Sequence, residues 1–169
     1  MNISNLEELE GVLSHYGVNT SKWQSDTKLK LLRNINNKSL RLEEDDHGNI
    51  MIVQDMIIAS VIHQKEGGTR LKLVSGSQHD FFFRVFPKYG ENNVDVLSRE
   101  CKERGIFRLE DNTHSAPQMS SRESSYSMYS GITGKTIIHS FEVYISYKGY
   151  RPSGYVDKKG QHFRWEECT

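Results

Sequence analysis

The chain of 169 residues has the length of one ordinary domain, which is enough to build a single buried core. Its 22 basic and 22 acidic residues cancel, and this balance argues against a dedicated binder of DNA, RNA or an anionic membrane. No run approaches the length of a membrane span, and the start "MNISNLEELEGVL" lacks the basic-then-apolar order of a secretion signal. We therefore expect a soluble, intracellular protein.

The N-terminal part carries two segments with the apolar spacing of a helix. "NLEELEGVLSHYG" and, further on, "KLKLLRNI" repeat leucine and other apolar residues at intervals of about three or four positions. We predict a helical extension over residues 1–37 and a single compact domain over residues 38–169.

From residue 38 the period of the apolar residues changes to that of strands. "SLRLEE", "IMIVQDMIIASVIHQ" and "TRLKLVSG" are separated by the turns "DDHGN" and Gly67-Gly68, so the last two form a predicted hairpin. "HDFFFRVFP", "GIFRLE", "KTIIHSFEVYISY" and "GQHFRWEE" continue the strand pattern. With helices before and between the strands, the fold class is α+β with a mixed sheet.

One later helix is predicted, over residues 92–104. Val94, Leu97 and Cys101 recur there at helical spacing and form its expected buried stripe. Cys101 and Cys168 are the only cysteines and lie far apart in sequence, so we expect free thiols rather than a disulfide framework or a metal site.

The polar segment over residues 111–134 is rich in serine and is predicted to be a long surface loop. We expect a mobile stretch at residues 116–124, because serine-rich sequence buries little apolar area. We expect an anchored stretch at residues 126–132, where Tyr126 and Tyr129 pack on the sheet or line a pocket.

The segment "FPKYGENNVDVLSRECKERGI", residues 86–106, carries the most informative spacing. Glu91 is followed by seven residues and then by Arg99-Glu100, with Glu103 three positions later. Residues three apart lie about 60° apart around a helix, so Glu100 and Glu103 are predicted to share one face. A pair of carboxylates on one face is able to hold a hard cation such as Mg²⁺.

This spacing resembles the box of Nudix hydrolases, Gly-x5-Glu-x7-Arg-Glu-apolar-x-Glu-Glu-x-Gly-apolar. The resemblance implies a Nudix-like α/β/α sandwich in which Glu100 and Glu103 bind magnesium and Arg99 orients the helix by a salt bridge. On this interpretation the catalytic residues are Glu103, Glu100 and Arg99. The residues that bind the nucleotide or steady its loop are Glu91, Lys88 and Arg122.

The box also departs from the family pattern, and each departure affects chemistry. Val85 stands where the first glycine belongs, and valine does not readily take the positive φ that such a loop often needs. Arg104 replaces the second glutamate of the pair, which the resemblance implies is a principal magnesium ligand, by a fixed positive charge. The Gly105-Ile106 pair comes one residue early. A shift of one residue restores that spacing but takes Glu91, Arg99 and Glu100 out of register, so we interpret the box as degenerate.

A second, looser resemblance covers nearly the whole chain. The order of the segments is similar to that of a group of Nudix-like proteins from plants, algae and protists, with Ser130 where that group has a proline. The residues that would fill the group's positions are Trp23, Lys28, Ser125-Tyr126 or Ser127-Tyr129, Gly131, Ile132, His139 and Trp165.

Other residues with a possible chemical role each have a simpler structural interpretation. His139, inside an apolar strand, is a general base or a packed sheet histidine, and the second is the commoner case. The rings of "FFF", residues 81–83, stack on a base or pack in the core. Arg122 either touches phosphate from a flap or sits in a passive loop.

These observations favour a binding module that keeps a Nudix-like cleft. Its expected partner is a nucleoside diphosphate in that cleft or a protein that binds the N-terminal helices. The first alternative is a magnesium-dependent Nudix phosphohydrolase, in which a metal-activated water attacks phosphorus. The second alternative is a structural subunit of a larger assembly. Magnesium is expected only if the protein is an active hydrolase, and no nucleic-acid or membrane partner is expected.

Overall fold

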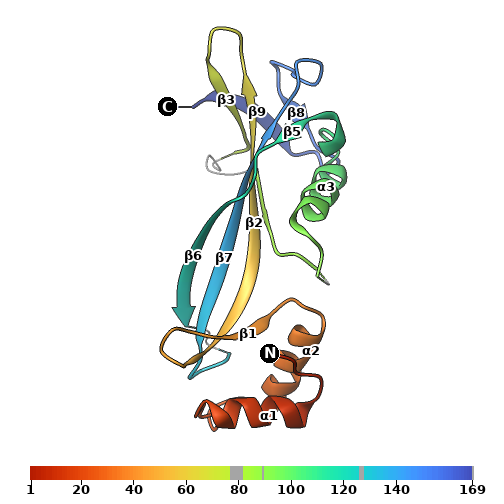
Figure 1. The fold of residues 1–169 in the computed structure, drawn as a ribbon. Coiled ribbons are helices and arrows are strands. Elements are labelled where there is room, and N and C mark those ends of the chain that lie inside the picture. Colours follow the sequence, from red (N-terminus) through yellow and green to blue (C-terminus); the bar gives the residue numbers. More distant parts are fainter. Residues whose placement is uncertain (77–81, 89, 126–127, 169) are drawn as a thin grey trace. The chain divides into compact units, whose positions relative to one another are not determined.

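The computed structural model describes residues 1–76, 82–88, 90–125 and 128–168 (Figure 1). The chain forms two compact units. Unit 1 comprises Met1–Met56, Phe86–Gly90 and Ser120–Ile138, and unit 2 comprises Ile57–Val85, Glu91–Met119 and His139–Thr169. The elements are α1 (Leu6–His15), α2 (Thr27–Asn36), β1 (Arg41–Glu44), β2 (Ile50–Gln64), β3 (Arg70–Val74), β4 (Phe83–Val85), α3 (Asn93–Arg104), the 3₁₀ helix η1 (Leu109–Asp111), β5 (Thr113–His114), β6 (Gln118–Ser125), β7 (Thr133–Tyr144), β8 (Tyr155–Val156) and β9 (His162–Glu167).

In unit 1 the predicted N-terminal helices pack on strands. The Asn5 side chain caps α1 by accepting from the backbone N–H of Glu8. Leu9 of α1, Leu31 of α2 and Ile52 of β2 are fully buried in one apolar cluster. Residues 1–37 therefore share a core with β1 and the first half of β2, and the boundary predicted after residue 37 stays a prediction.

The end of the serine-rich segment is anchored in unit 1, as predicted. The Trp23 indole N–H donates to the Ser130 carbonyl at 2.8 Å, and its ring meets the Tyr129 ring edge-on at 5.8 Å. Tyr129 and Ile132 are buried in the unit 1 core, whereas Met128 is exposed. Tyr126 and Ser127, which were also expected in this stretch, lie outside the described residues.

The prediction of one long loop over residues 111–134 is wrong. β6 pairs with β7, and β5 pairs with β7 through Thr113 and His114. All eight residues of β6 are exposed, so this strand is held by main-chain hydrogen bonding rather than by apolar burial. Strand prediction relies on apolar alternation, and "QMSSRESS" has none to detect.

The sheet confirms the predicted α+β class with a mixed sheet. The hairpin of β2 and β3 is present and antiparallel, and β9 pairs with the other edge of β3. β7 lies beside β2 and runs in the same direction. Thr136 faces Gln54 near the start of both strands, and the Ile145 N–H, just beyond β7, donates to Ile62 near the end of β2.

In unit 2 the core lies between the sheet and α3. Leu97 and Cys101 are buried there as predicted, but Val94 is 46% exposed and Val96 takes the buried position instead. "GIFRLE" was predicted to be a strand and instead forms an irregular segment leading into η1, from which Ile106 and Phe107 pack on the core. Among the described residues, no helix is long and apolar enough to span a bilayer.

Candidate functional site

The box helix α3 begins and ends where its sequence dictates. The Asn92 side chain accepts from the Asp95 N–H, which caps the first turn. Gly105 ends the helix in the left-handed conformation, with φ of 72°. A Cβ atom on Gly105 would lie 2.7 Å from the Lys158 side chain, so glycine also allows a close approach at this end.

Arg99 is the centre of an ion-pair network along α3. Its Nε and Nη2 donate to the two carboxylate oxygens of Glu91, each at 3.0 Å, and its Nη1 donates to Glu100 at 2.8 Å. The pKa of Arg99 is raised above its ordinary value, chiefly because the guanidinium donates to Glu91. Arg99 therefore forms a salt bridge, and the helix-orienting role that the resemblance implies for it stays a prediction.

Glu100 is enclosed by positive charge. The residue is only 8% exposed. Its Oε1 pairs with Arg99 at 2.8 Å, and its Oε2 pairs with Nη2 of Arg104 at 3.4 Å. Both carboxylate oxygens of the first predicted metal ligand therefore face a guanidinium.

Glu103 has a different environment from Glu100. Its side chain is 60% exposed, and its ion pair to Arg99 is long, at 3.9 Å. Among the described residues, no group of three or more histidine, cysteine, aspartate or glutamate side chains is placed to hold a metal ion. One enclosed and one solvated carboxylate do not fit a magnesium site, since that ion needs several oxygen ligands in near-octahedral order.

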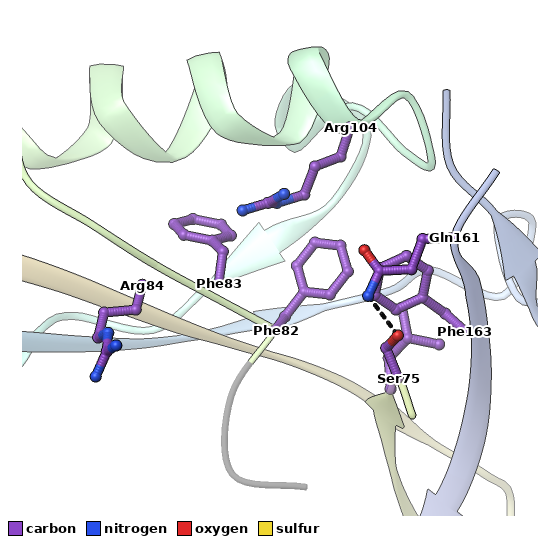
Figure 2. Close-up of a pocket in the computed structure, with 8 residues that line it drawn as sticks. Ser75, Phe82, Phe83, Arg84, Arg104, Gln161 and Phe163 are labelled. Carbon is purple, nitrogen blue, oxygen red and sulfur yellow. Dashed lines mark hydrogen bonds between the residues drawn. The ribbon is translucent and has the colours of Figure 1, made fainter. Parts of the chain in front are cut away.

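Arg104 folds back over aromatic rings (Figure 2). The centre of its guanidinium lies 5.5 Å from the Phe82 ring centroid and 5.3 Å from that of Phe83, within cation–π range. Its buried Nε has no hydrogen-bond partner among the described residues. Phe82 and Phe83 are both buried in the unit 2 core, whereas Phe81 lies outside the described residues.

Arg104 also lines a pocket of about 280 Å³ in unit 2. Across the pocket from α3, the Gln161 amide donates to the Ser75 hydroxyl at 2.6 Å (Figure 2). The complete lining is Leu73, Ser75, Phe82, Phe83, Arg84, Arg104, Gln161 and Phe163. Our reading of the sequence singled out Arg104 only as a departure from the box, and no pattern pointed to Ser75 or Gln161, which come from separate strands and turns.

The remaining predicted site residues are not part of this pocket. Lys88 and Arg122 belong to unit 1, while Glu91 and all of α3 belong to unit 2, so the binding roles of Lys88 and Arg122 stay predictions. His139 is half-buried, and its Nδ1 lies 3.4 Å from the side-chain amide of Asn93 at the start of α3.

The two cysteines are expected to differ sharply in reactivity. Burial raises the pKa of the Cys101 thiol to about 12, so little thiolate forms at mildly alkaline pH, whereas Cys168 is exposed. An aromatic disulfide reagent should therefore modify Cys168 alone in the folded protein and both thiols in denaturant. Rapid modification of both thiols without denaturant would contradict the packing of α3 described above.

No family model and no curated protein matches the chain. Among solved structures, it is similar to the C. elegans Ap4A hydrolase, with 14% identity and a TM-score of 0.40 over 68% of this chain and 80% of that one. A binary complex of a C. elegans Ap4A hydrolase matches with 13% identity and a TM-score of 0.38, over 68% and 79% of the two chains. RenU, a Nudix hydrolase from M. smegmatis, matches with 10% identity and a TM-score of 0.40, over 75% and 79%. At this identity and similarity the matches bear on no individual residue and on no activity.

Proposed function

We propose that the chain is a Nudix-like binding module that takes a nucleoside diphosphate without magnesium and does not hydrolyse it. The observation that carries this proposal is the pairing of both Glu100 oxygens with guanidinium groups, one from Arg99 and one from Arg104. The box helix and its Glu91–Arg99 salt bridge are formed, so the degenerate sequence keeps the shape of the motif. The Glu100 carboxylate, however, already has two guanidinium groups as ion-pair partners.

The physical argument concerns competition for Glu100. Magnesium would have to displace the Arg99 and Arg104 guanidinium groups from a carboxylate that is largely removed from water, and Arg104 would then lose its ion pair with Glu100. Arg104 would also remain close to the ion, where its fixed charge repels a divalent cation. Glu103 alone, exposed to water, is a weak site for an ion that gives up its hydration shell reluctantly.

One observation favours a magnesium-dependent phosphohydrolase as the second candidate. Arg99 makes a salt bridge, as the family resemblance implies for a working box, here through two hydrogen bonds of 3.0 Å to Glu91. If Arg104 swung away from Glu100, two carboxylates together with substrate phosphates would supply oxygen ligands. The candidates therefore differ in whether Mg²⁺ binds and whether turnover depends on Glu103.

Calorimetry of the whole chain separates the two. We expect heat when ADP-ribose is added in the presence of a chelator, no heat when Mg²⁺ is added alone, and no hydrolysis of ADP-ribose when both are present. The variant Glu103→Gln should behave as the wild type, because this exposed carboxylate has no metal to hold. Magnesium-dependent turnover that disappears in Glu103→Gln would replace this proposal with the hydrolase.

A protein partner at the N-terminal helices remains a prediction without support from packing. Leu29 of α2 is 50% exposed. A single exposed leucine is ordinary on a soluble surface and does not amount to an apolar interface.

A further inference from the structure

The pocket beside the last turn of α3 has the chemistry of a binding site in its own right. We propose that it takes a small flat anion, a ring that bears one phosphate or carboxylate group, and that Arg104 binds the anionic group directly. This inference rests on the proposed function, since it requires that no metal ion stand between Arg104 and the ligand.

The residues that line the pocket indicate that its ligand carries a negative charge. Among the described residues that line the pocket, the charged side chains are Arg84 and Arg104, with no aspartate or glutamate. Figure 2 shows the Arg84 side chain directed away from the aromatic rings, while the Arg104 guanidinium extends over them. Arg104 is therefore the group that a ligand anion would meet.

Arg104 has binding capacity left over. Its ion pair with Glu100, at 3.4 Å, is longer than the 2.8 Å pair that the same carboxylate makes with Arg99. A guanidinium carries five N–H donors in a planar fork that suits phosphate and carboxylate oxygens. One long ion pair occupies little of that fork, and the buried Nε has no partner among the described residues.

The other walls of the pocket suit a flat ring. Phe82, Phe83 and Phe163 belong to the unit 2 core and form the floor of the pocket, each no more than 7% exposed, and the first two lie under the Arg104 guanidinium. Opposite them the Ser75 hydroxyl accepts from Gln161, and among the described residues the Ser75 O–H and the Gln161 side-chain carbonyl have no further partner. A ring with polar atoms at one edge would meet both kinds of partner.

The size of the pocket restricts the ligand further. Its volume of about 280 Å³ lies just below the roughly 300–1,000 Å³ that is usual for ligand pockets. One ring system with a single anionic group fits this space better than a complete nucleoside diphosphate with a second group attached. The two sources of such chemistry are a nucleoside monophosphate, or the equivalent end of a larger nucleotide, and a free aromatic carboxylate.

The test is calorimetry of the whole chain with a chelator present and four probes: AMP, benzoate, pyrophosphate and adenosine. We expect AMP or benzoate to bind, and whichever binds identifies the source. Pyrophosphate lacks the ring and adenosine lacks the charge, so each should bind at least about tenfold more weakly. Arg104→Gln should weaken the preferred probe by roughly tenfold or more, because it removes the charge and keeps a side chain of similar reach.

The matched control is Arg108→Gln, which makes the same change of charge at a side chain that is 72% exposed and outside the pocket lining. It should leave probe affinity unchanged. If Arg104→Gln does not fold, Gln161→Ala serves instead. Gln161 is exposed, so this variant should keep the fold and weaken the preferred probe several-fold.

The inference is overturned if neither AMP nor benzoate binds, if adenosine or pyrophosphate binds as well as they do, or if folded Arg104→Gln binds as the wild type does. It is also overturned if Gln161→Ala, used as the substitute, leaves affinity unchanged. Heat from Mg²⁺ alone or magnesium-dependent turnover would instead overturn the proposed function. If none of the probes binds and Mg²⁺ gives neither heat nor turnover, this pocket is not the binding site. The proposed non-hydrolytic binding module is not contradicted by that result.

Discussion

Replacing Gly154 by alanine is expected to destabilise unit 2 strongly. Gly154 has φ of 90°, a conformation that disfavours a Cβ atom, and the added methyl group would overlap the Phe163 carbonyl oxygen in the adjacent strand β9. Backbone cannot move aside as a flexible side chain can. We expect a loss of about 3 kcal/mol or more in the free energy of unfolding, from backbone strain and overlap together.

The measurement is thermal unfolding followed by the fluorescence of Trp165, which lies in the same unit, in a background of Trp23→Phe. For a chain of this length a loss of about 3 kcal/mol corresponds to a fall in the melting temperature of roughly 6–12 °C. Because Gln161 and Phe163 follow Gly154 in the β8–β9 hairpin, the variant should also disturb the pocket.

Gly160→Ala is the matched control in the same hairpin. Its φ is 83°, but no atom lies within 4 Å of the position that a Cβ would take. The control should show only the strain of a left-handed alanine, about 1–2 kcal/mol. Equal losses for the two variants would mean that the close approach of Gly154 to β9 is not present in solution.

The helix of the box was predictable because its signals are local. Asn92 as cap, Gly105 as terminator and the apolar spacing between them all act within a few residues, so α3 appears where the pattern placed it. A salt bridge of Arg99 was expected from the family resemblance, but its partner Glu91 was not. One residue of the predicted buried stripe was wrong, since Val94 and Val96 are equally apolar and only the tertiary packing selects Val96.

Two strand assignments failed for opposite reasons. "GIFRLE" is apolar enough for a strand, but Ile106 and Phe107 contribute to the core from an irregular segment that precedes η1. β6 has no apolar pattern and is nevertheless a strand, because β7 supplies hydrogen-bonding partners for its main chain. In both segments, residues far away in sequence determine whether a strand forms. The periodicity within one segment does not detect such residues.

The pocket could not be predicted for a similar reason. Arg104 stood out in the sequence as the loss of a metal ligand, yet the positions of Phe82 under its guanidinium and of Gln161 across the pocket depend on how β4 and β9 reach α3. Arg104 was therefore recognisable as a departure from the box, but its place in the pocket was not.

The second large effect is expected at Arg99. Its guanidinium lies between Glu91 and Glu100, at 3.0 and 2.8 Å, and its side chain is only 23% exposed. Arg99→Met keeps much of the apolar stem but removes the cation that Glu91 and Glu100 share, and among the described residues Arg104 is the partner that Glu100 keeps. We expect a loss of about 2 kcal/mol in the free energy of unfolding, less than for a fully buried pair because water still reaches this one.

Chemical denaturation of Arg99→Met, read by Trp165 fluorescence in the Trp23→Phe background, measures this loss. The control Arg108→Met removes the same charge from an exposed side chain whose ion pair to Glu110 is 3.9 Å long, and its unfolding midpoint should stay near that of the wild type. Adding Glu91→Gln to Arg99→Met should restore part of the stability, because it removes one of the two carboxylates that have lost Arg99.

The stability of Arg99→Met also bears on function, because the same network decides whether Glu100 is available to a metal. If Arg99 holds Glu100 tightly, removing Arg99 lowers the stability and frees one carboxylate oxygen of Glu100. Arg99→Met should then bind Mg²⁺ with more heat than the wild type does. If instead Arg99→Met unfolds at the wild-type midpoint, the network is a solvated face of α3. Glu100 could then leave its guanidinium partners and bind a metal. That result would favour the magnesium-dependent hydrolase over the binding module.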